Sequence, residues 1–86
     1  MPEVSRFFGI VIRMYYDEHN PPHFHAEYNG QKVQISIEPI YVIKGKLPRR
    51  ALSLVLEWVA LHQTELLANW DRARSERELL WIEPLD

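Results

Sequence analysis

The 86-residue chain has no cysteine, which excludes disulfides and thiolate metal sites. It also lacks a basic excess: 10 Lys and Arg stand against 12 Asp and Glu, for a formal net charge of -2, so total charge gives no signal for nucleic acid. No apolar run approaches the roughly 20 residues of a membrane span, and the start of the chain has no apolar core of a signal peptide. We therefore expect one small cytoplasmic domain over residues 1–86.

Two stretches, residues 7–16 and 40–44, have strand character. Apolar residues alternate from Phe7 to Tyr16, which predicts a strand in which Gly9 marks a bulge or a close approach. Ile40 to Lys44 predicts a short edge strand, because a proline precedes it and lysines occupy its end. Such an edge can pair with another chain, so a homodimer is compatible with the sequence.

The strongest local signal is a hairpin around Asn29-Gly30, since both residues tolerate the positive φ of a type I′ turn. A two-residue loop predicts the register His25 opposite Gln34 and His23 opposite Ser36. One face is then apolar and the other polar, so both histidines are expected to leave the core. The predicted apolar face consists of Phe24, Ala26, Val33, Ile35 and Ile37.

Pro48 is well placed to open a long helix that ends near residues 70–74. The flank of its apolar stripe carries Trp58, His62, Glu65 and Asn69 at steps of three and four residues. The tryptophans are expected in the core and its seams, and residues 79–82 as a short strand or an extended segment across the helix. The predicted fold class is α+β: an antiparallel sheet of three or four strands, a hairpin meander, covered on one face by one long C-terminal helix.

The histidine-rich stretch before the hairpin, DEHNPPHFHAEY, carries the candidate chemistry. His23 and His25 are two apart on a strand, so their imidazoles share one face and can serve as acid and base, with Arg13 or Lys32 stabilising a phosphate. The same pair can share a metal ion if Asp17 or His19 folds back as a third ligand. The simplest alternative is a solvated polar face on which Glu27 and Lys32 form an ordinary cross-strand ion pair.

A local basic cluster stands out in this net acidic chain. Arg49 and Arg50 follow Lys44 and Lys46, and such a cluster can contact RNA or DNA phosphates or can simply keep an edge soluble. His62, on an apolar flank, has the character of a hydrogen-bonded core histidine.

The strings PPHFHAEY and LPRRAL…EW…LH…EL…NW, with the closing IEPL, resemble the bacterial family known as domain of unknown function 4160, over almost the whole chain. Members of that family resemble the toxin half of small type II toxin–antitoxin modules. The resemblance implies a small antitoxin-like protein partner, of the kind called domain of unknown function 2442. The family signature falls on residues 19, 21–26, 49, 50, 57, 58, 62, 65, 69 and 70. Glu18 departs from it where aspartate is more usual, residues 74–81 are more charged and apolar than usual, and the turn after Ser36 lacks a glycine.

Together these patterns predict a toxin-like protein that acts on RNA, or else a non-enzymatic module that binds protein or nucleic acid. If it is an enzyme, we expect a metal-independent, ribonuclease-like activity with no cofactor. The candidate catalytic residues are His23, His25, Asp17 and Arg13. The candidate nucleic-acid or partner-binding residues are His19, Lys32, Arg49, Arg50, His62, Glu65 and Asn69.

Overall fold

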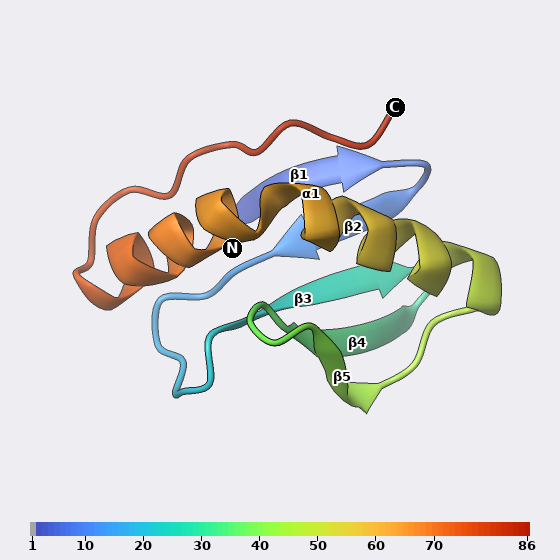
Figure 1. Cartoon of the computed structure of the whole chain (residues 1–86), viewed down its shortest axis with the longest axis horizontal. Coiled ribbons are helices and arrows are strands. Elements are labelled where there is room, and N and C mark those ends of the chain that lie inside the picture. The colour runs from blue at the N-terminus through green and yellow to red at the C-terminus, as the bar shows by residue number, and fades with distance from the viewer. Residues whose placement is uncertain (1) are drawn as a thin grey trace.

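The structure, a computed structural model, describes residues 2–86, which form five strands followed by one helix (Figure 1). The sheet is antiparallel throughout, with its strands in chain order, and α1 lies across one face. The predicted α+β class is confirmed, with five strands rather than three or four. No helix of the described chain is long and apolar enough to cross a membrane. The elements are β1 (Glu3–Phe7), β2 (Ile10–Arg13), β3 (His23–Tyr28), β4 (Gln31–Ser36), β5 (Tyr41–Gly45) and α1 (Arg49–Arg74).

The additional strand is β1. A turn at Phe8-Gly9 separates it from β2, where the sequence predicts a single continuous strand. Phe8 has φ of 50° and Gly9 of 81°, matching the 50° and 81° of Asn29 and Gly30. Of the two alternatives predicted for Gly9, the bulge is wrong, because the chain reverses there and pairs β1 with β2, and the close approach is confirmed by the Tyr28 ring. Glycine is required at this turn for its positive φ, and a Cβ would also come within 3.3 Å of the Tyr28 ring.

The hairpin of β3 and β4 has the predicted register over all six pairs, including His25 with Gln34 and His23 with Ser36. This register follows from the two-residue turn, because side chains alternate strictly between the faces of a strand. The apolar face that it creates lies against α1 and is fully buried. The hairpin thereby fixes the backbone of both histidines.

Trp58 of α1 is the centre of the core, with none of its surface exposed. Its ring lies 5.4 Å from the Phe7 ring and 5.8 Å from the Phe24 ring, and its Nε1 donates a hydrogen bond to the Glu83 carbonyl at 2.8 Å. The helix follows Pro48, as predicted, and ends at Arg74. Aromatic rings from one helix and two strands thus join the two layers, and the Trp58 hydrogen bond adds the backbone of the tail.

The C-terminal tail runs back extended beside β1, as Figure 1 shows in red. The Ile82 amide donates to the Val4 carbonyl at 2.8 Å, and the buried Asn69 amide bonds both the N–H and the C=O of Leu80. Trp81 is 58% exposed, so its predicted place in the core or its seams is wrong. The tail covers the β1 side of the sheet, whereas β5 forms the other edge and leaves Tyr41 partly exposed.

Candidate functional site

The loop between β2 and β3 folds back over the end of the sheet. The Ile37 amide donates to the Pro22 carbonyl at 3.0 Å, and Arg74 Nη1 donates to Asn20 Oδ1 at 3.1 Å. The second bond ties the loop to the C-terminal end of α1, which lies at the same end of the sheet in Figure 1. Adjacent prolines also restrict the loop to extended geometry before β3 begins.

This loop brings the carboxylate of Glu18 between the imidazoles of His23 and His25. Glu18 Oε1 lies 3.2 Å from His23 Nε2 and is also in hydrogen-bond contact with His25 Nε2. One ligand atom from each of the three residues falls within 4.8 Å of the other two. We call these three residues the Glu–His centre. It joins a loop residue to two residues of a strand, so the fold determines its geometry.

His23 is buried, although the sequence predicts that both histidines leave the core. Its side chain is 7% exposed, and its ring lies 5.2 Å from the Trp70 ring and 5.3 Å from the His25 ring. Trp70, from the last turns of α1, covers His23 at the end of the sheet. His25 is half-buried on the polar face, where the Tyr15 ring meets it edge-on at 4.6 Å. Both imidazoles therefore have fixed positions, and water reaches them from one side.

Hydrogen bonding defines the state of His23. Its Nδ1 lies 2.7 Å from the Pro21 carbonyl oxygen, which only accepts hydrogen bonds, so Nδ1 carries a proton. Its Nε2 faces the Glu18 carboxylate, another acceptor. This contact is favourable only if Nε2 also carries a proton or if a cation lies between the two groups. The centre is therefore built to hold positive charge.

Glu18 supplies the matching negative charge. Partial burial on its own raises the pKa of this carboxyl group, but the hydrogen bond from His25 and the positive charges of His25 and His23 outweigh it. The net result is a pKa below the usual value for glutamate. Glu18 is therefore an ionised carboxylate at neutral pH, suited to bind a proton-bearing imidazole or a metal ion.

A groove with cationic side chains adjoins the centre on the polar face of the sheet. It has a volume of about 300 Å³ and is lined by His25, Lys32, Val33, Gln34, Lys44 and Gly45. Glu27, the predicted ion-pair partner of Lys32, bonds Arg13 at 3.2 Å instead. Within residues 2–86, neither lysine of the groove has a carboxylate within salt-bridge distance. We call this the cationic groove; His25 belongs both to it and to the centre.

The remaining predicted site residues lie outside this centre, although Arg13 is directly opposite His25 on the neighbouring strand. Asp17 and His19 are exposed on the loop and contribute no atom to the cluster, so the third group beside the imidazoles is Glu18 rather than either of them. Arg13 is held on β2, where its backbone pairs with that of His25. Arg49 and Arg50 are exposed in the first turn of α1, at the opposite end of the helix from the loop.

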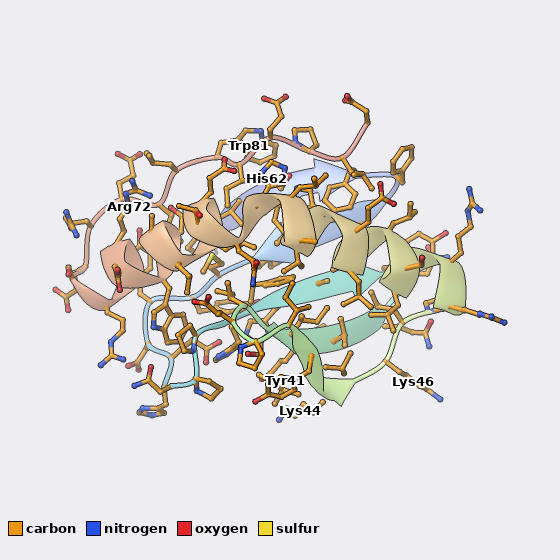
Figure 2. The ribbon with its side chains drawn as sticks, viewed as in Figure 1. Tyr41, Lys44, Lys46, His62, Arg72 and Trp81 are labelled. Atoms are coloured by element: carbon orange, nitrogen blue, oxygen red, sulfur yellow. The ribbon has the colours of Figure 1, made fainter. Side chains whose placement is uncertain are left out.

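The helix flank divides between structural and surface roles. His62 Nδ1 bonds Glu65 Oε1 at 2.5 Å, and His62 has non-helical φ and ψ angles of -130° and 25°. Asn69 is fully buried and uses its amide to hold the tail. Figure 2 shows Lys44 beside β5 and His62 on the opposite side of the molecule. The predicted binding residues therefore do not form one surface.

Sequence reasoning missed four residues that shape the site: Glu18, Lys44 as part of the groove, Tyr15 and Trp70. Strand periodicity reveals that His23 and His25 share a face, but it says nothing of a loop that folds back. A signal for Glu18 was present in its place within a histidine-rich, proline-stiffened loop. Burial of His23 by Trp70 depends on packing between residues 47 positions apart, which no local pattern encodes.

Fold and site together define a small α+β domain with a carboxylate–imidazole centre at one end of an antiparallel sheet. The family model described as Domain of unknown function (DUF4160) matches residues 9–71, and the chain belongs to that family. The matched region contains the whole Glu–His centre, the cationic groove and most of α1. No curated protein and no solved structure matches the chain.

Proposed function

We propose that this protein is the toxin component of a bacterial type II toxin–antitoxin module and that it acts on RNA at the Glu–His centre. The observation that carries the proposal is the position of His25, which belongs to the centre and also lines the cationic groove. A phosphodiester bound by Lys32 and Lys44 would lie next to the reactive imidazole. The toxin context rests on the resemblance of the family's members to toxins of such modules.

The chemistry of RNA cleavage suits this set of groups. The 2′-oxygen attacks the adjacent phosphorus, loses its proton to a base, and the 5′-oxygen leaves with a proton from an acid. A carboxylate with two imidazoles can serve this reaction through the imidazoles themselves or through an ion that they hold. Lys32 and Lys44 would stabilise the negative charge that develops on the phosphate oxygens.

An antitoxin-like partner would act by covering this surface. The β1 edge of the sheet is already covered by the tail, whereas β5 is an open edge on which Tyr41 is 48% exposed and Val42 38% exposed. A partner strand paired to β5 would extend the sheet and lie beside Lys44 of the cationic groove. In a homodimer, the same edge would pair with β5 of a second copy of the chain. We place the protein, with either partner, in the cytoplasm.

The test is expression of the chain alone in bacteria, beside His25→Ala, Glu18→Gln and the matched control His19→Ala. We expect growth arrest and RNA breakage with the parent and with His19→Ala, because His19 is exposed and lies outside the centre. Both effects should disappear with His25→Ala and Glu18→Gln, once circular dichroism shows each variant folded.

Two outcomes decide against the proposal. Absence of arrest by the parent removes the toxin role. Arrest that survives both His25→Ala and Glu18→Gln removes the centre from the mechanism. If the purified chain binds RNA in the groove and never cuts it, the non-enzymatic binding module is the correct function.

A further inference from the structure

The three polar atoms of the Glu–His centre are arranged like the ligands of a metal ion. In a tetrahedral zinc site, bonds of roughly 2.0–2.1 Å place neighbouring ligand atoms about 3.3 Å apart. Glu18 Oε1 and His23 Nε2 are separated by 3.2 Å, and one ligand atom from each of the three residues falls within 4.8 Å of the others. A small rotation of the Glu18 carboxylate away from His25 would admit an ion between them.

The second hydrogen bond of His23 supports the same assignment. Histidines that bind metals usually donate the other ring N–H to a carbonyl or carboxylate, which fixes the tautomer and the ring orientation. His23 Nδ1 makes such a bond with the Pro21 carbonyl at 2.7 Å. If Nε2 carries no proton, its lone pair is directed at the Glu18 carboxylate, and this arrangement repels unless a cation lies between them. An ion resolves this repulsion without an added proton on the ring.

The rings are also held in place before any ion binds. Trp70 packs on His23 with ring centroids 5.2 Å apart, and Tyr15 meets His25 at 4.6 Å. The side chain of His25 is 19% exposed and that of Glu18 25% exposed, so solvent reaches the centre from the polar face. A bound ion would therefore keep a position open to water, as catalytic zinc sites do.

We propose that Glu18 Oε1, His23 Nε2 and His25 Nε2 bind one divalent transition-metal ion of the zinc class, with an open position facing the cationic groove. Two imidazoles and one carboxylate are a ligand set found in hydrolytic zinc enzymes. Water on such an ion loses its proton near neutral pH and becomes a base or nucleophile. The role of this water in RNA cleavage rests on the proposed function, whereas the ion site rests on the geometry of the three side chains.

The experiment uses tag-free protein stripped with a chelator and titrated with zinc chloride by calorimetry. We expect one ion per chain, with affinity at least tenfold weaker in Glu18→Gln and in His25→Ala, because each loses a ligand atom. His19→Ala is the matched control and should bind as the parent does. Cobalt should give visible absorption bands in the parent that both ligand variants lack.

The outcomes separate this inference from the proposed function. Absence of one-to-one zinc binding, or binding unaffected by Glu18→Gln and His25→Ala, overturns the ion site. Loss of binding in His19→Ala places the site elsewhere and overturns it as well. Zinc binding by a chain that neither arrests growth nor breaks RNA supports the ion site and refutes the proposed function. RNA cleavage by stripped protein in the presence of chelator keeps the function and refutes the role of the ion.

Discussion

Removal of the two lysines of the cationic groove should weaken RNA binding by an amount that the structure allows us to estimate. Lys32 and Lys44 line the groove beside His25, and neither has a carboxylate within salt-bridge distance in the described part of the chain. Each is therefore free to neutralise one phosphate. Replacement of both by glutamine removes two such contacts and leaves side chains of similar length.

The magnitude follows from counterion release. For single strands, each neutralised phosphate contributes a slope of about -0.7 to the dependence of log K on log salt. Lys32→Gln with Lys44→Gln should therefore reduce the slope by about 1.4. At 0.15 M salt the same relation gives about a fourfold loss of affinity per lysine, and about 15-fold for the pair.

Fluorescence anisotropy of a labelled single-stranded RNA, measured over a series of salt concentrations, gives both numbers. Lys46→Gln is the matched control, because Lys46 is exposed just after β5 and does not line the groove. It should change the slope far less than Lys44→Gln does. An unchanged slope in the double variant, or an equal change in Lys46→Gln, would show that RNA does not lie in this groove.

Three further predictions concern stability. Phe8→Asn should raise the free energy of unfolding in urea by about 0.5 kcal/mol, because asparagine tolerates the φ of 50° at this exposed turn position better than phenylalanine; a destabilised variant contradicts the turn assignment. Asn69→Ala should lower it by about 1–3 kcal/mol and speed proteolysis of the tail, since the N–H and C=O of Leu80 both lose their hydrogen-bond partner; an unchanged tail would refute that role. Arg6 lowers the pKa of Glu3, mainly by a hydrogen bond, so the carboxylate stabilises the fold above its unfolded pKa and less as pH falls through its folded pKa. Glu3→Gln should thus have a slightly lower free energy of unfolding than the parent at pH 7 and the same free energy of unfolding in strong acid. A stability difference that grows as the pH falls would contradict this direction.

The hairpin is the part of the fold that the sequence predicts in detail. Asn29-Gly30 satisfies the turn geometry by local residue preference alone, and the register of β3 and β4 follows from it. The turn at Phe8-Gly9 has the same backbone angles and is not apparent, because phenylalanine is not a turn residue and continues the apolar alternation. Local preference therefore reveals a turn only where the residues are chosen for it.

The site shows the same division between local and distant effects. That His23 and His25 share one face of a strand is a local property, and the structure places their rings 5.3 Å apart. The third member, Glu18, depends on the path of a loop that Arg74 holds from the far end of the chain. The burial of His23 depends on Trp70 in the same way. These contacts join segments separated by tens of residues, so only the folded chain reveals them.

The most direct test of the Glu–His centre is a long-range proton–nitrogen correlation spectrum of the four histidine side chains, recorded with and without zinc. We expect His23 to carry its proton on Nδ1 in the metal-free protein, as its bond to a carbonyl requires. Zinc should then shift the Nε2 signals of His23 and His25 together and leave those of His19 and His62 in place. Signals of His23 and His25 that behave independently, like that of the exposed His19, would contradict a shared centre.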